Sequence, residues 1–375
     1  MLSGLVPGNA AGTGFHHDHA SPAAFLVFIK IMSDKKFYTI LIILLAAIIA
    51  AAYFCFVLPR GETVSAQIIS GGIVKSYIQD RKIIITCGEG KNYDYTIKGI
   101  CYGPDIKGET FYENYKRDIV LVKQSGASSV RTYRPLAAYN ADGSLDKEKT
   151  KEMLDAFFNE KITISAGFSY EDMAEGGLLE EYLTAFGGHP ALLMIVLGNE
   201  YNYHYGQWFT KEEWFLRLWQ AVKTAKILMP DRIIATVHGE VPSKEEYEEY
   251  AAAGLELVMM NIYRGANFGF ARQDWYDISD NMPWVVSEFG KGSKDARGND
   301  VSKLQASSLQ TLIRSMEQGY LFMLTDDLQK GEDEITQGAG REDSFGIFDK
   351  DGNPKPAAKI VAEEYSKIKG VIYLD

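Results

Sequence analysis

The sequence predicts an α/β protein: a closed (β/α)8 barrel, or TIM barrel, preceded by a short β-hairpin and an N-terminal transmembrane helix. Three observations predict this fold. Apolar runs alternate with amphipathic helical stretches, which is the pattern of right-handed parallel βαβ units. Eight such units follow one another, and their near-continuous apolar runs are typical of strands covered on both faces. An uncharged apolar run at 37–58 is long enough to cross a bilayer as a helix.

The runs that we expect to form the barrel strands are 96–103, 128–134, 162–168, 191–200, 232–239, 255–264, 283–290 and 320–327. The helical stretches that follow them are 111–126, 146–160, 178–186, 210–230, 243–254, 270–279, 301–318 and 355–370. Thr210 and Ser243 each precede a Glu by three residues, as a capping box requires. An open doubly wound sheet is the alternative, but "YGPDIKGET" after the first run is not the glycine-rich phosphate loop that such a sheet usually carries.

The chain divides by composition into four parts. We expect a disordered cytoplasmic N-terminus at 1–36, a transmembrane signal-anchor at 37–58, a linker and β-hairpin cap at 59–94, and the barrel at 95–375. Lysines cluster before the apolar run, which places that side in the cytoplasm and exports the barrel. The alternative is a signal peptide cleaved after "VSA", before Gln67, although the apolar run is longer than the usual core of a signal peptide.

The overall charge and the cysteines narrow the class of protein. A net charge of −11 argues against a nucleic-acid partner, because contact with phosphates needs a basic surface. Cys87 and Cys101 lie in strand-like segments. In an exported protein they could form a disulfide, but two buried free thiols are equally consistent with the pattern.

Polar groups gather at the ends of the predicted strands, where barrel enzymes carry their catalytic residues. Seven apolar residues at 191–197 lead directly into Gly198, Asn199 and Glu200. The run "VVSEFG" brings Glu288 to the end of the seventh strand in the same way. The other strand-end candidates for substrate contact are Tyr102, Arg131, His238 and Tyr263.

Two carboxylates on opposite sides of a barrel mouth suit the cleavage of a glycosidic bond with retention of configuration. One carboxyl group must be protonated and the other ionised. Arg131 and the Tyr263 hydroxyl would favour an ionised neighbour, whereas the aromatic residues after Glu200 would partly desolvate it. Trp208 and the nearby tyrosines also offer stacking faces to sugar rings. Only His204 and His238 lie near the rim, so the sequence predicts neither a metal site nor a cofactor.

The motifs "KGICYGP", "VRTYRP", "IVLGNE", "VMMNIYRG", "VVSEFG" and "FGIFDKDGNPKPAA" together resemble the catalytic barrel of glycoside hydrolase family 2, in clan A. The resemblance covers about residues 95–368. It implies that Glu200 is the acid/base and Glu288 the nucleophile. It also implies that Asn199 binds the sugar 2-hydroxyl, that Tyr263 donates to the nucleophile, and that Arg131 lies beneath it.

The sequence departs from the family pattern in two ways. Only residues 59–94 separate the apolar run from the barrel, although family 2 enzymes usually carry β-sandwich domains there. The strand "YLFMLTDD" also lacks the Trp that many clan members place beneath the sugar. Both departures speak against an exo-acting galactosidase or glucuronidase. A compact single barrel is more similar to the β-1,3-glucanosyltransferases and β-glucanases of the clan.

The expected function is therefore a retaining β-glycoside hydrolase that acts on a β-linked oligo- or polysaccharide such as a β-glucan. The alternatives are a glucanosyltransferase of the same clan and a non-catalytic, membrane-tethered barrel that binds carbohydrate. The expected partners are the carbohydrate and, through residues 37–58, the membrane.

Overall fold

The computed structural model of the chain describes residues 71–88, 90–103, 110–327, 330–331 and 333–374. Its centre is a closed barrel of parallel strands in the order β10-β11-β4-β5-β6-β7-β8-β9. The strands are β4 (Lys98–Cys101), β5 (Ser129–Arg131), β6 (Thr163–Phe168), β7 (Leu192–Leu197), β8 (Ile233–Gly239), β9 (Leu257–Asn261), β10 (Val286–Phe289) and β11 (Gly319–Leu321). Each of the eight expected runs forms one barrel strand, so the predicted (β/α)8 barrel is confirmed.

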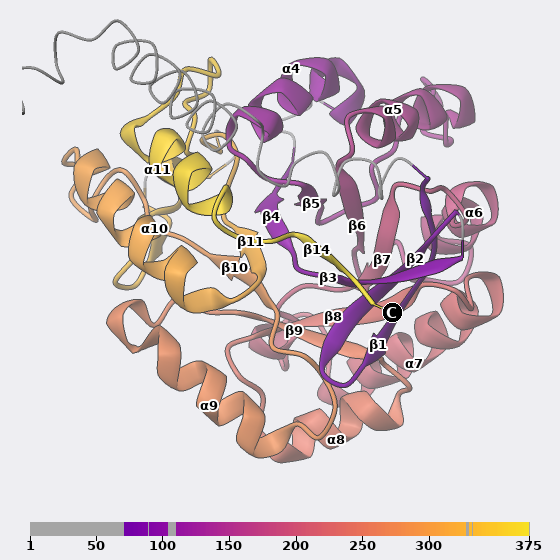
Figure 1. Ribbon diagram of the computed structural model, residues 1–375. Helices are drawn as coiled ribbons and strands as arrows, with labels where there is room; N and C mark the ends of the chain where they lie inside the picture. The colour runs from indigo at the N-terminus through magenta and orange to yellow at the C-terminus, as the bar shows by residue number, and fades with distance from the viewer. Residues whose placement is uncertain (1–70, 89, 104–109, 328–329, 332, 375) are drawn as a thin grey trace, which may run out of the picture. The chain divides into compact units, whose positions relative to one another are not determined.

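Helices surround the barrel, one after each strand (Figure 1). They are α4 (Phe111–Gln124), α5 (Lys147–Asn159), α6 (Leu178–Phe186), α7 (Lys211–Leu228), α8 (Lys244–Ala252), α9 (Phe268–Ile278), α10 (Ser302–Met316) and α11 (Pro356–Tyr365). Full capping boxes begin α7 at Thr210 and α8 at Ser243, as predicted, and a third begins α4 at Thr110. Each box satisfies backbone N–H groups that would otherwise lack a partner in the first helical turn.

A small antiparallel sheet covers the N-terminal end of the barrel (Figure 1). Its strands are β1 (Ile73–Gln79), β2 (Lys82–Cys87), β3 (Lys91–Tyr95) and β14 (Val371–Tyr373), in the order β1-β2-β3-β14. The expected hairpin is the β2–β3 pair, and the sequence did not indicate that β1 and the C-terminal β14 would extend it. Ser76 on β1 donates to the carbonyl of Leu193 and accepts from the N–H of Ile233, which ties the sheet to the beginnings of β7 and β8.

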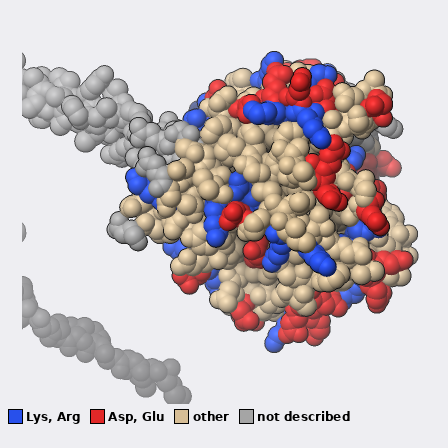
Figure 2. Space-filling model, turned by 90° about the vertical axis from the view of Figure 1, so that its right-hand side faces the viewer, with Lys and Arg blue, Asp and Glu red and all other residues tan. Residues whose placement is uncertain are grey.

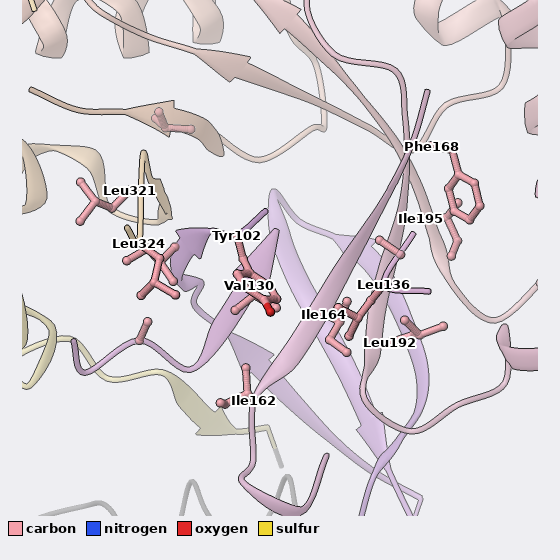
Figure 3. Packing of buried hydrophobic residues seen from close by; sticks show 14 of the residues in the cluster. Tyr102, Val130, Leu136, Ile162, Ile164, Phe168, Leu192, Ile195, Leu321 and Leu324 are labelled. Atoms are coloured by element: carbon pink, nitrogen blue, oxygen red, sulfur yellow. The ribbon is translucent and has the colours of Figure 1, made fainter. Parts of the chain in front are cut away.

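The apolar residues pack in two layers because successive side chains of a strand point to opposite faces. Ile195 and Leu197 of β7 face the helices, whereas Val196 lies inside the barrel. The outer layer includes the side chains in Figure 3, which come from several strands and loops. The inner layer continues into the small sheet through residues such as Ile85 and Tyr95. Toward its N-terminal end the barrel interior is filled by these apolar side chains and by a few buried hydroxyl groups that bond to one another, such as those of Tyr95 and Thr163.

Several predictions fall on parts of the chain that the structure does not describe, including the segments 1–36 and 37–58. Within the described ranges, no helix is long and apolar enough to span a membrane. Cys87 and Cys101 are buried free thiols, so of the two alternatives the structure has the unbridged one. Acidic and basic side chains are interspersed over the face that Figure 2 presents, so the net charge of −11 is not gathered there into one continuous acidic patch.

Candidate active site

The chain turns inward where β7 ends at Leu197. Gly198 has a φ of +82°, and a Cβ there would stand 2.5 Å from the ring of Trp214, so only glycine fits. Glu200 is itself left-handed, with φ 56° and ψ 26°, and its N–H donates to the carbonyl of Val237 at 3.1 Å. Residues other than glycine rarely adopt this conformation. The hydrogen bond to β8 therefore helps to hold the Glu200 carboxylate at the barrel mouth.

The C-terminal mouth of the barrel opens into a cavity of about 920 Å³. This volume is near the upper end of the range of small-molecule sites, roughly 300–1,000 Å³. The predicted residues Asn199, Glu200, Tyr263 and Glu288 all line it. Further lining residues that matter below are Tyr133, Tyr203, Glu240, Arg264, Phe322, Lys330 and Glu342. The structure thus brings the two strand-end glutamates into one cavity.

Three donors hold the carboxylate of Glu288, which is only 5% exposed in β10. Arg131 Nη1 and the Tyr133 hydroxyl donate to Oε1 at 3.0 and 2.7 Å, and the Tyr263 hydroxyl donates to Oε2 at 3.0 Å. Burial raises the pKa of both tyrosines well above 10, so both hydroxyls stay protonated and can donate. Hydrogen bonds and a positive charge favour an ionised carboxylate. The surroundings of Glu288 therefore suit an anion.

A second network fixes the amide of Asn199. Its Oδ1 accepts from Arg131 Nη2 at 2.6 Å and from Asn261 Nδ2 at 3.2 Å. Asn261 is oriented in turn because its own Oδ1 accepts from the Ser287 hydroxyl at 2.7 Å. Since both bonds to Asn199 use its oxygen, its Nδ2 is the end that can donate to a bound molecule. Arg131 thus connects the Asn199 amide to the Glu288 carboxylate.

Glu200 lies in a different electrostatic environment. Burial raises its pKa to about 7 from its ordinary value of 4.5, and the nearby charge of Glu288 adds to the shift. The amide of Asn261 and the charge of Arg131 oppose the shift without cancelling it. At neutral pH a substantial fraction of Glu200 is therefore protonated. One cavity thus contains an acid that can give up a proton and a carboxylate held by three donors.

Four of the residues predicted to contact substrate do not line the cavity: Arg131, which donates to Glu288 and Asn199, and Tyr102, His238 and Trp208. Tyr102 is 1% exposed and packs against Phe111 and Phe157 in the outer apolar layer, to which Val130 also belongs (Figure 3). Tyr102 follows the end of β4 with its ring directed toward the helices, so its placement does not support the predicted contact with substrate. A strand end alone does not determine the face to which a side chain points.

His238 and Trp208 also lie elsewhere. His238 is buried, with Nδ1 3.0 Å from the carbonyl oxygen of Glu240 and Nε2 3.6 Å from a carboxylate oxygen of Glu246 on α8. Trp208 is exposed and stacks on the ring of His204, with centroids 3.6 Å apart. Neither lines the cavity, so the placement of these two residues does not support direct contact with a bound substrate.

Several of the residues that build the site were not among the predicted substrate contacts. Tyr133 and Asn261 were visible as strand-end polar residues, and the contact of Tyr133 with Glu288 could have been found from that signal. Lys330 and Glu342 come from the long segment after β11, where no periodic pattern marks a functional position. Phe322 follows β11 and lines the cavity; it packs edge-on against Tyr133, with ring centroids 6.4 Å apart.

No protein-family model matches this sequence, and no curated protein matches it. Solved structures do share its fold. A GH2 β-galacturonidase from Eisenbergiella tayi bound to galacturonate has a TM-score of 0.58 and 18% identity, over 79% of this chain and 55% of that one. A β-D-glucuronidase of Dictyoglomus thermophilum has a TM-score of 0.56 and 17% identity, over 80% and 55%. A β-glucuronidase of Faecalibacterium prausnitzii has a TM-score of 0.55 and 16% identity, over 79% and 52%.

These comparisons bear on the fold. The described chain has the eight-stranded parallel barrel that was expected from the resemblance to glycoside hydrolase family 2, and structures of that family are among those that share it. The chain spans about half the length of the solved structures it matches. At 16–18% identity, the likeness supports a common barrel and leaves the chemistry to be argued from the residues in the cavity.

Proposed function

We propose that this protein is a retaining β-glycoside hydrolase in which Glu200 is the acid/base and Glu288 the nucleophile. The observation that carries the proposal is the contrast between the two carboxyl groups of one cavity. Glu288 accepts three hydrogen bonds, one of them from an arginine, whereas Glu200 has a pKa of about 7. A retaining glycosidase needs one protonated and one ionised carboxyl group.

The reaction would proceed by two displacements. The Glu288 carboxylate attacks the anomeric carbon and forms a glycosyl ester, the bond from that carbon to the leaving oxygen breaks, and Glu200 gives its proton to that oxygen. Water then attacks the same carbon, Glu200 takes the proton from the water, and the ester bond to Glu288 breaks. The two inversions give net retention. This route needs the carboxyl groups about 5–5.5 Å apart.

Other residues would position the sugar for these steps. Asn199 can donate from Nδ2, as a contact to the sugar 2-hydroxyl requires, because Arg131 and Asn261 occupy its oxygen. Tyr133 and Tyr263 would keep the nucleophile in place until it attacks. Tyr203 lines the cavity with its side chain largely exposed, which suits stacking against a pyranose ring. None of these roles requires a metal or a cofactor.

The proposed substrate is a β-linked oligo- or polysaccharide, with a β-glucan as one candidate. The names of the solved structures that share the fold support a β-glycosidase in general, since they include β-galacturonidases and β-glucuronidases. A glucanosyltransferase would use the same first displacement but a sugar hydroxyl in place of water. A non-catalytic binding barrel would have no need of two carboxyl groups in such different states.

The decisive experiment is a screen of the purified protein against β-linked aryl glycosides and oligosaccharides, with analysis of the products by NMR. Turnover with initial products of retained configuration supports the proposal, and larger products would indicate transfer. Inverted products would overturn the mechanism. Binding without any turnover would favour the carbohydrate-binding barrel.

We also propose that residues 37–58 anchor the protein in a membrane, with the barrel outside the cytoplasm. The support is the apolar run and the lysines that precede it. The protein should then remain with membranes after carbonate extraction. A soluble mature form beginning near Gln67 would instead indicate a cleaved signal peptide.

A further inference from the structure

The wall of the cavity carries more acidic than basic side chains. Among the described lining residues, the acidic ones are Glu200, Glu240, Glu288, Asp327 and Glu342, and the basic ones are Arg134, Arg264 and Lys330. The number of lining cations does not by itself show whether the cavity can bind an anionic ligand. A cation can bind the negative charge of a ligand readily only if no carboxylate of the protein already pairs with it, so the partners of each cation are considered in turn.

Lys330 is engaged by two carboxylates of its own segment. Its Nζ lies 2.9 Å from Glu342 and 3.1 Å from Glu334. Glu342 is fixed further because it accepts from the Thr336 hydroxyl at 2.9 Å. Burial lowers the pKa of Lys330, but the two carboxylates together raise it by more than burial lowers it. Lys330 is therefore positively charged, and these two carboxylates balance its charge.

Arg264 and Arg134 are engaged in the same way. Arg264 lies 2.8 Å from Glu240 across the cavity wall and 2.6 Å from Asp274 of α9. Arg134 donates to both carboxylate oxygens of Asp172, at 2.8 and 3.3 Å, and Asp172 is 3% exposed. A bidentate pair of this kind occupies one edge of the guanidinium group, formed here by Nε and Nη2, that could otherwise bind a carboxylate ligand.

The carboxylate of a uronic acid would therefore have two costs in this cavity. To pair with one of these cations, it would have to compete with a carboxylate that already holds that cation. It would also come close to Glu288 and Glu342, whose like charges repel it in a partly buried site. An uncharged sugar has neither cost, because its hydroxyl groups can bind to charged and neutral groups alike.

We propose that the cavity accepts uncharged β-linked sugars and discriminates against β-linked uronic acids. This inference rests on the glycosidase function proposed above and concerns its substrate class. It separates this chain from the galacturonidases and glucuronidases that share its fold. The discrimination follows from the ion pairs Lys330–Glu342, Arg264–Glu240 and Arg134–Asp172, which leave each described lining cation already paired.

The test compares matched substrates that differ only at C6. The p-nitrophenyl β-glycosides of glucose and galactose are assayed beside those of glucuronic and galacturonic acid. We expect kcat/KM for an uncharged glycoside to exceed that of its matched uronide by about 100-fold or more, which is a difference of about 2.7 kcal/mol in transition-state binding. A uronide that is turned over as fast as its uncharged partner would overturn the inference and leave the glycosidase function intact. If neither these compounds nor β-linked oligosaccharides are cleaved, the function itself fails.

A pair of variants tests the physical cause. Glu342→Gln removes the carboxylate that lines the cavity and holds Lys330, so it should raise the ratio of uronide to uncharged turnover by about 10-fold. Glu334→Gln is the matched control, because Glu334 holds the same lysine but does not line the cavity. It should change the ratio less than about 3-fold. Equal ratios in both variants, with unfolding temperatures like that of the parent protein, would contradict the role of the ion pair.

Discussion

The ends of β7 and β10 each bring a glutamate to the same cavity, but the two carboxyl groups lie in different environments. Glu288 lies within β10 and is fixed by side chains from β5 and the loops after β5 and β9. Glu200 lies beyond the end of β7 in a left-handed turn, where burial and the charge of Glu288 act on its carboxyl group. The two identical side chains thus differ in their position along the strand and in the groups around them: Glu288 accepts three hydrogen bonds, whereas burial raises the pKa of Glu200.

The largest effect is expected from removal of the proposed nucleophile. Glu288→Gln keeps the size of the side chain but cannot form the glycosyl ester, so kcat should fall by about 10⁴-fold or more. Initial rates on an activated aryl glycoside give the measurement. A 2-fluoro glycoside with a good leaving group should label the parent protein on the peptide that contains Glu288. Labelling of another peptide would reject Glu288 as the nucleophile.

Removal of the proposed acid/base, Glu200, should have a smaller effect that depends on the substrate. Glu200→Gln cannot donate a proton, so natural glycosides, which have poor leaving groups, should lose about 10²–10⁴-fold in kcat/KM. Aryl glycosides with a good leaving group should lose much less in their first step. In Glu200→Ala, added azide should partly restore turnover by attacking the glycosyl ester in place of water.

The matched control for this prediction is Glu240→Gln. Glu240 lines the same cavity but is paired with Arg264. It should affect the two kinds of substrate equally. A loss in Glu200→Gln that is the same for natural and activated glycosides would count against its role as the acid.

The donors around Glu288 can be weakened one at a time. Tyr133→Phe and Tyr263→Phe each remove one hydroxyl that donates to its carboxylate. A hydrogen bond to a charged group contributes about 1.5–3 kcal/mol, so kcat/KM should fall by roughly 10–100-fold in each variant. Tyr102→Phe is the control, because Tyr102 packs in the outer apolar layer; it should change kcat/KM less than about 2-fold. A large loss in Tyr102→Phe would instead agree with the sequence-based prediction of substrate contact.

The sequence was informative about the fold because the barrel strands are buried on both faces and the helices have regular apolar faces and caps. It also predicted which glutamates would meet, since both follow apolar runs directly. The orientation of Tyr102 and His238 could not be predicted, because one residue of shift at a strand end turns a side chain from the cavity to the helices. The pairing of Lys330 with Glu342 could not be predicted, because it depends on the path of an irregular segment. The addition of β14 to the small sheet could not be predicted either, because it depends on contacts between distant parts of the chain.

The smallest expected effect concerns stability rather than rate, and it tests the Glu200 environment without any substrate. Glu200 has a pKa of about 7 in the folded protein and about 4.5 when it is exposed in the unfolded chain. Between these values the folded state binds the proton more tightly, so folding loses stability as the pH rises from 4.5 through 7. Glu200→Gln cannot ionise and escapes this loss. Relative to the parent protein, the variant should therefore be more stable at pH 8 than at pH 4.5, by about 2 kcal/mol after allowance for partial exposure.

Urea unfolding of both proteins at pH 4.5 and pH 8 measures this difference, and Glu240→Gln is again the control. The double variant Glu200→Gln/Glu288→Gln, compared with Glu288→Gln alone, separates the effect of burial on Glu200 from the effect of the Glu288 charge. Burial is the larger cause of the shift and the charge of Glu288 the smaller. In the Glu288→Gln background, the pH-dependent gain in stability from Glu200→Gln should therefore be smaller than in the parent protein, but it should not disappear. A gain that vanishes in the Glu288→Gln background would mean that charge repulsion, not burial, keeps Glu200 protonated. A difference independent of pH would contradict the raised pKa itself.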